Sequence, residues 1–132
     1  MTLAISTALR TDRFDDAVDR TREALAEQGF GILTEIDMAA TLQAKLGADL
    51  EDYRILGACN PPLAHRAVEV DRQIGLLLPC NVIVRRDPDD AAAVIVEAMD
   101  PQVMVEVTGD ADLRPIAAEA GTRLRAALAA LG

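Results

Sequence analysis

The sequence predicts an α+β fold: a two-layer α/β sandwich in which helices pack on one face of a mainly antiparallel or mixed sheet. Three observations lead to this prediction. Segments with strand patterns alternate with segments of helical periodicity, and the last element is a long amphipathic helix suited to lie across a sheet. A length of 132 residues suits one hydrophobic core, so we expect residues 1–132 to form a single domain.

The chain is expected to begin with a strand and a helix. Residues 2–9 form the predicted strand, and residues 14–28 form the predicted helix, with Thr11 or Asp12 as its N-cap. Gly29 ends this helix. One face of the helix is apolar and is expected to be buried; it comprises Ala17, Val18, Thr21, Ala24 and Leu25.

A second strand and a short helix follow. Residues 30–36 alternate in a way that places Phe30, Ile32, Thr34 and Ile36 on one side of a strand. Asp37 is suited to cap a short helix that stops at Gly47. Glu35 and Asp37 share a side, where paired carboxylates suit acid–base work or hard cations, although capping already accounts for Asp37.

The middle of the chain predicts a strand, a helix and another strand. Residues 53–59 read as the strand, and Asn60-Pro61 reads as an N-cap followed by proline in the first turn of a helix that runs to about residue 70. The next strand is predicted over residues 77–86, and the Asp87-Pro88-Asp89-Asp90 sequence after it indicates a turn.

The last third predicts a strand and a long helix. Residues 91–99 are apolar on both faces, which favours a central strand. Residues 101–107 are consistent with a short helical turn or a strand, and we favour the turn. The final helix tolerates Pro115 in its first turn. Its apolar stripe comprises Leu113, Ile116, Ala117, Ala120, Leu124, Ala127, Leu128 and Leu131.

Composition excludes several classes of function. The net charge of −9 disfavours binding to nucleic acid or to anionic membranes, and an aromatic content of 2% leaves few platforms for stacking flat ligands. No apolar run reaches the ~18 residues that a membrane span needs. We therefore expect a soluble cytoplasmic protein in which both cysteines are reduced thiols.

Two similar segments are the best candidates for a functional site. The segments are Ile55-Leu56-Gly57-Ala58-Cys59-Asn60-Pro61-Pro62 and Leu76-Leu77-Leu78-Pro79-Cys80-Asn81-Val82, and they hold the only two cysteines. A thiol, an amide and a proline at the edge of an apolar run suggest a role besides packing. If the two strands pair antiparallel, the end of one meets the start of the other, and the segments converge on one site.

The two cysteines differ in their predicted surroundings. Cys59 directly precedes a helix N-terminus, where the helix dipole favours its thiolate and suits a reactive cysteine or a soft-metal ligand. Cys80 lies within an apolar strand. The alternative for both is a packing role, since small buried cysteines are common in cores. No Cys-x-x-Cys pair is present, and the sequence predicts no metal site from a known motif.

Other polar residues have ordinary explanations. His65, the only histidine, is expected on a solvated helix face beside Glu69. Arg54 lies in a strand among apolar neighbours, where its guanidinium needs a carboxylate, an anionic ligand or access to solvent. We include Arg54 among the candidate ligand-binding residues, which are Arg54, Cys59, Asn60, Pro79, Cys80 and Asn81.

The chain resembles domain-of-unknown-function family 302. The resemblance rests on three ordered blocks: residues 29–37, GFGILTEID; residues 53–61, YRILGACNP; and residues 75–82, GLLLPCNV. It implies a compact two-layer α/β fold that often occurs as a dimer. It implies no activity, substrate or cofactor.

Three functions remain from the sequence alone. The first is a dimeric binding module that takes a small molecule or an anion at the two Cys-Asn segments. The second is thiol chemistry, meaning sulfur transfer, a redox step or soft-metal handling by Cys59. The third is an assembly role in which the segments shape a subunit interface. Neither cysteine has a visible base or resolving partner, so binding is favoured.

Overall fold

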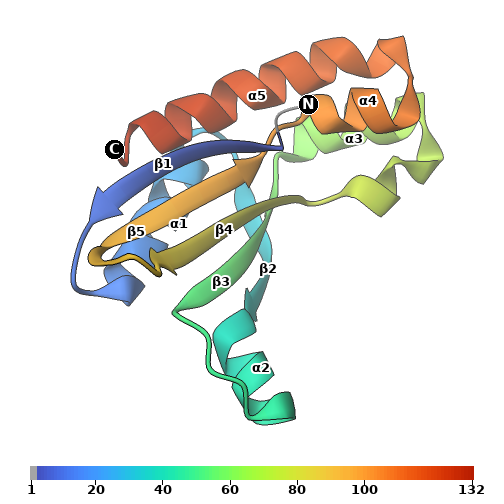
Figure 1. The fold of residues 1–132 in the computed structure, drawn as a ribbon. Coiled ribbons are helices and arrows are strands. Elements are labelled where there is room, and N and C mark those ends of the chain that lie inside the picture. The colour runs from blue at the N-terminus through green and yellow to red at the C-terminus, as the bar shows by residue number, and fades with distance from the viewer. Residues whose placement is uncertain (1–2) are drawn as a thin grey trace.

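The computed structural model describes residues 3–132, and a five-stranded antiparallel sheet forms its main layer. Helices α1 (Phe14–Glu27) and α5 (Arg114–Ala129) cover one face of this sheet (Figure 1). The predicted two-layer α+β fold is confirmed. The strands, in their order across the sheet, are β1 (Ala4–Arg10), β5 (Asp90–Met99), β4 (Cys80–Asp87), β3 (Tyr53–Cys59) and β2 (Gly31–Asp37).

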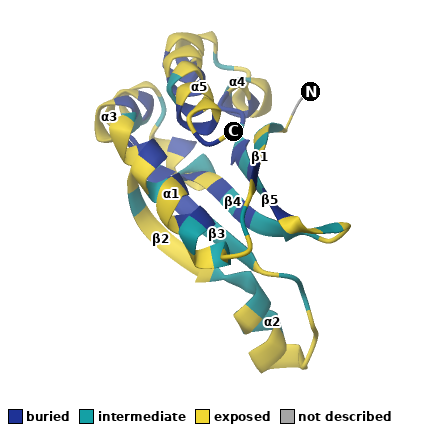
Figure 2. Ribbon diagram, turned by 90° about the vertical axis from the view of Figure 1, so that its left-hand side faces the viewer, coloured by how far each residue is buried: buried dark blue, intermediate teal, exposed yellow. Residues whose placement is uncertain are grey.

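The first hydrophobic cluster fills the space between the sheet and helices α1 and α5. The strands contribute alternate residues such as Leu56, Val82 and Val96, which are fully buried. The predicted apolar face of α1 is buried along its whole length. Figure 2 shows these buried residues between the helices and the sheet.

A second hydrophobic cluster lies beside the first, among the shorter helices. It is formed by α3 (Pro61–Val70), α4 (Gln102–Thr108), the 3₁₀ helices η1 (Arg72–Leu77) and η2 (Ala111–Leu113), and the first half of α5. Helix α5 belongs to both clusters, since Ile116 and Ala120 lie in the second and Leu124 and Leu128 in the first. The predicted stripe of the last helix therefore spans two cores.

The other face of the sheet is without a covering helix over β1, β5 and β4 (Figure 1). Ile36, Ile55 and Ile83 are register partners on this face and form a row across β2, β3 and β4. All three are at least partly exposed, and Ile36 is 44% exposed. The sheet thus presents an apolar row to solvent.

Helix α2 (Met38–Leu46) projects from the sheet at the end of β2 (Figure 1). Its predicted caps are confirmed: the Ala40 amide donates to the Asp37 carboxylate at 2.9 Å, and Gly47 adopts a left-handed φ of 64°. None of its residues is buried, so packing contributes little to this helix.

Strand β2 corrects one prediction. An irregularity between Ile32 and Thr34 interrupts the pairing with β3, because Ile32 faces Ala58 while Thr34 faces the next residue, Gly57. The extra residue reverses the alternation, as a β-bulge does. Ile36 therefore lies on the opposite face from Ile32, and the prediction that they share a side was wrong.

Smaller differences concern the ends of elements. The N-cap of α1 is Arg13, which makes no side-chain cap, while Thr11 accepts a hydrogen bond from the Arg13 amide at 3.1 Å. Residues 72–77, the first of which begin the predicted strand region at 77, form η1, and β4 starts only at Cys80. The favoured helical turn at 101–107 is confirmed as α4.

Two further strand predictions need comment. β5 is an interior strand, but β4 occupies the middle of the sheet. β1 begins at Ala4, and Thr2, where the first strand was predicted to start, lies outside the described residues.

Candidate functional site

The two Cys-Asn segments meet because β3 and β4 are antiparallel neighbours. Ala58 is the register partner of Cys80, and Gly57 is the partner of Asn81. The end of β3 therefore lies beside the beginning of β4, as expected if these strands pair antiparallel. Convergence of the two segments is confirmed.

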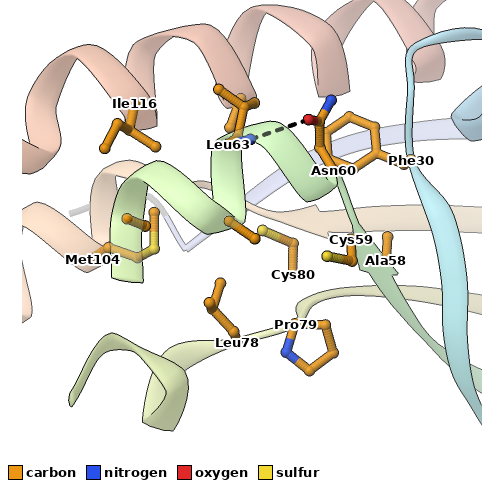
Figure 3. A pocket seen from close by; sticks show the side chains of 13 residues that line it. Phe30, Ala58, Cys59, Asn60, Leu63, Leu78, Pro79, Cys80, Met104 and Ile116 are labelled. Carbon is orange, nitrogen blue, oxygen red and sulfur yellow. Dashed lines mark hydrogen bonds between the residues drawn. The ribbon is translucent and has the colours of Figure 1, made fainter. Parts of the chain in front are cut away.

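A cavity of about 30 Å³ lies where these strand ends meet the shorter helices. Its walls combine residues of both hydrophobic clusters, so it marks the seam between them. Figure 3 shows the side chains that surround it. The thirteen lining residues are Phe30, Ala58, Cys59, Asn60, Leu63, Ala64, Ala67, Leu78, Pro79, Cys80, Met104, Ile116 and Ala120.

The cavity walls are almost entirely apolar. Asn60 supplies the only amide side chain among the lining residues of the described chain, and the two cysteines supply thiols. Cys59, Ala64 and Pro79 are half-buried, whereas Cys80 is buried with 7% exposure. The half-buried residues form the solvent side of the cavity, and Cys80 lies deeper.

Asn60 fixes the start of α3. Its side-chain oxygen accepts a hydrogen bond from the Leu63 amide at 3.3 Å, as the dashed line in Figure 3 marks, so the predicted cap is confirmed. Asn60 is 8% exposed. Gly29 leaves room for it: a Cβ at Gly29, whose φ is +86°, would lie 2.9 Å from the Asn60 amide nitrogen. Glycine at 29 therefore serves both the left-handed turn and this close approach.

Gly57 and Pro79 form the second close contact of the site. A Cβ at Gly57 would lie 2.7 Å from Pro79 Cγ and would collide with the Thr34 hydroxyl. Glycine thus allows Pro79 to lie against β3. The Leu78–Pro79 peptide bond is cis.

The thiols of Cys59 and Cys80 are both free. Burial raises the pKa of the Cys80 thiol to about 11, and the nearby Cys59 charge raises it further in the same direction. Desolvation disfavours the charged thiolate, so Cys80 stays protonated at neutral pH. Cys80 is therefore poorly suited to act as a nucleophile.

Four of the six predicted site residues line the cavity: Cys59, Asn60, Pro79 and Cys80. Asn81 does not, because successive strand residues point to opposite faces, and it is exposed. Arg54 does not, because it lies near the other end of β3. The strand alternation around Cys80 was a signal that could have separated Asn81 from the cavity.

Arg54 is held by carboxylates rather than by the cavity. Its guanidinium lies 3.3 Å from Asp15, 3.5 Å from Glu35 and 3.6 Å from Asp37, measured between nitrogen and oxygen. It also lies 5.8 Å from the centre of the Phe14 ring. These contacts account for a guanidinium in this strand and for the paired carboxylates of β2.

His65 lies outside the cavity on the exposed face of α3. Its Nε2 is 3.4 Å from a Glu69 carboxylate oxygen one turn later, so the expected pairing on a solvated helix face is confirmed. None of the cavity-lining residues within residues 3–132 is a histidine, aspartate or glutamate. The cavity thus offers its thiols no general base.

Sequence reasoning missed the helical half of the cavity. Leu63 and Ala67 come from α3, Met104 from α4, and Ile116 and Ala120 from α5. The last two belong to the predicted apolar stripe, but only the packing of α5 against α3 and α4 shows which part of that stripe faces a cavity.

Two searches of residues 3–132 gave negative results. No group of three or more His, Cys, Asp and Glu residues is arranged to hold a metal ion. No helix of that part of the chain is both long and apolar enough to cross a membrane.

The antiparallel sheet, its single covering layer of helices and the apolar cavity at the β3–β4 end define a small α+β domain. The chain belongs to the family described as Domain of unknown function DUF302, whose model matches residues 5–131. The resemblance drawn from the three sequence blocks is therefore confirmed.

A solved structure supports the same assignment. The crystal structure of an uncharacterized conserved DUF302 protein from Bacillus stearothermophilus is similar to this chain, with a TM-score of 0.90 and 27% sequence identity. The match covers 100% of each chain. No curated protein matches the sequence.

Proposed function

We propose that the protein is a small-ligand binding module whose binding site is the cavity at the meeting of β3 and β4. The observation that carries this proposal is the convergence of both Cys-Asn segments on one cavity between two hydrophobic clusters. A well-packed seam has no need of a void, because protein interiors are otherwise close-packed.

The walls of the cavity favour a neutral ligand over an anion. None of the thirteen lining residues in the described chain carries a basic side chain, and the Asn60 oxygen is already used by the helix cap. A volume of about 30 Å³ is far below that of pockets that enclose drug-sized molecules. The ligand is a very small, weakly polar species, or the apolar end of a larger molecule.

Xenon under pressure tests whether the cavity accepts a ligand, because apolar cavities bind this atom. We expect saturable shifts of the Ala58, Leu63 and Cys80 amide signals in nitrogen–proton spectra. Ala64→Leu places a larger side chain at the half-buried side of the cavity and should abolish these shifts. Ala118→Leu, on the exposed face of α5, is the matched control and should preserve them. Unsaturable shifts, or shifts unchanged by Ala64→Leu, would contradict the proposal.

We also propose that the module is a homodimer joined through the open face of its sheet. The row formed by Ile36, Ile55 and Ile83 supplies an apolar surface, and the Arg85–Glu97 ion pair at 2.9 Å lies beside it. A two-fold axis brings the same patch of both subunits together, so an apolar row can bury itself against its copy.

Light scattering across a dilution series tests the dimer. We expect twice the 14.1-kDa chain mass at high micromolar concentration, and Ile83→Lys should shift the protein toward the mass of one chain. Leu76→Lys changes a residue that is 85% exposed away from this face, so it should retain the dimer. A wild-type mass near 14.1 kDa at high concentration would refute this part of the proposal.

Thiol chemistry is the second candidate, and the presence of both thiols at one cavity favours it. Catalysis by these thiols is less well supported, since Cys80 has a raised pKa and the cavity lining includes no base within the described residues. Handling of a soft ligand requires neither.

A further inference from the structure

Three sulfur-containing side chains line the same small cavity. Cys59 comes from the end of β3, Cys80 from the start of β4 and Met104 from α4, and Figure 3 shows all three around one space. The chain has two cysteines and four methionines, so both of its thiols are gathered here with one thioether. Apart from these sulfurs and Asn60, the lining side chains are hydrocarbon.

Sulfur donors without oxygen or imidazole donors select a particular class of ligand. Thiolate and thioether groups prefer soft metal ions such as Cu(I), whereas Mg²⁺ and Ca²⁺ prefer carboxylate, carbonyl and water oxygens. Structural Zn²⁺ sites have four ligands from cysteine and histidine, and the lining residues of the described chain supply two cysteines and no histidine. The size of the cavity agrees with this chemistry, because about 30 Å³ holds an ion but not a drug-sized molecule.

We propose that this cavity binds one Cu(I) ion through the sulfurs of Cys59, Cys80 and Met104. The inference rests on the proposed function, since it names the ligand of the same cavity. Binding involves no electron transfer. The two thiols each release a proton to solvent when their sulfurs bind the metal, so Cu(I) and two thiolates leave a complex of charge −1.

The surroundings of the cavity suit such a complex in two respects. Helix α3 begins directly after Cys59 and Asn60, and the partial positive charge of a helix N-terminus stabilises nearby negative charge. Met104 is buried with 2% exposure, and methionine adapts its unbranched side chain to irregular spaces. Its thioether adds a third soft donor without adding charge.

Anaerobic titration of the reduced full-length chain with Cu(I), in competition with bicinchoninate, tests the site. We expect one Cu(I) per chain and a rise in melting temperature on binding. Cys59→Ala and Cys80→Ala should each lower the affinity by at least about tenfold, since even outer-shell partners of metal sites contribute that much. Circular dichroism of the metal-free variants checks that each remains folded.

Methionine variants provide the matched comparison. Met104→Leu keeps an apolar side chain of similar size and should weaken Cu(I) binding, whereas Met38→Leu, in the projecting helix α2, should bind like the wild type. Equal affinity of these two variants would overturn the three-sulfur site. Equal affinity of the wild type and a Cys59→Ala/Cys80→Ala double variant would overturn the inference as a whole.

The xenon measurement separates this inference from the proposed function. A wild-type chain that shows the saturable, Ala64→Leu-sensitive xenon response but does not bind Cu(I) overturns the Cu(I) inference and leaves the binding module supported. A chain that binds neither probe overturns both.

Discussion

Cys59 and Cys80 have nearly the same local sequence but different surroundings. Both precede an asparagine, yet Cys59 is half-buried at the end of a strand while Cys80 is buried at the start of the next. Burial raises the pKa of Cys80 from 9.0 to about 11. The difference arises from tertiary packing, because α3, α4 and the Pro79 segment surround Cys80 more completely.

We predict that iodoacetamide alkylates Cys59 much faster than Cys80 in the folded protein. Because the thiolate is the nucleophile, a pKa near 11 instead of 9.0 lowers the reactive fraction of Cys80 about 100-fold at pH 8. The rate at Cys80 should therefore keep rising with pH until the pH approaches 11. Peptide mass spectrometry after graded labelling gives both rates.

The same labelling in guanidinium chloride is the control for this prediction. Unfolding removes the burial that raises the Cys80 pKa, so the two rates should become similar. Faster labelling of Cys80 than of Cys59 in the folded chain would show that burial does not govern these thiols.

Individual site residues could be predicted from the sequence only in part. Cys59, Asn60, Pro79 and Cys80 were found because a thiol, an amide and a proline interrupt apolar runs. Arg54 was included for its charge, but carboxylates on α1 and β2 hold it at the other end of β3. Local sequence thus indicates unusual residues, while their distance from a cavity depends on strand direction and register.

At the scale of elements, α3 positions the site, because its first turn follows Cys59 directly and its buried face lines the cavity. The helix begins where Asn60 accepts the Leu63 amide hydrogen bond. This start was predictable, since asparagine followed by proline is a strong N-terminal signal. Loss of the cap should therefore affect both stability and the cavity.

We predict that Asn60→Ala lowers the free energy of unfolding by about 0.5–2 kcal/mol, the usual contribution of an N-cap. Asn60→Asp keeps an acceptor oxygen and should retain much of this stability. Urea denaturation followed by circular dichroism measures both. Asp37→Ala removes the cap of α2, which has no buried residue, and should leave the amide signals of the cavity unchanged, whereas Asn60→Ala should move them.

If Asn60→Ala left both the stability and the cavity signals unchanged, the cap would have no structural role. Equal perturbation of the cavity by Asp37→Ala would show that these signals respond to any loss of stability. Either result would remove Asn60 as the residue that fixes the start of α3.

The elements that differ from prediction have identifiable physical causes. The irregularity in β2 inserts a residue between Ile32 and Thr34, and no glycine or proline at that point announces it. η1 occupies an apolar stretch whose composition equally suits a strand, and Ile74 is buried there against the second cluster. In both cases tertiary contacts decide between local structures that the sequence leaves nearly equivalent.

At the scale of the whole molecule, α5 links the two hydrophobic clusters. Its first half packs with α3 and α4, and its second half packs with α1 and the sheet. The cavity lies at the seam that this helix spans. The fold class and the long amphipathic helix were predictable from periodicity, but the division of its stripe between two clusters was not, because residues of both have the same apolar character.

We predict that residues 1–132 unfold as one cooperative unit, as expected for the proposed single domain, because α5 makes the stability of each cluster depend on the other. Leu124→Ala removes a fully buried side chain of the first cluster and should lower the free energy of unfolding by about 2–5 kcal/mol. At fixed protein concentration, calorimetry should show one transition whose calorimetric and van't Hoff enthalpies agree. Native-state hydrogen exchange should show that Leu124→Ala reduces protection in α3, across the seam, by as much as in α1. Two separate transitions, or reduced protection confined to α1 and the sheet, would mean that the clusters fold independently and that α5 does not couple them.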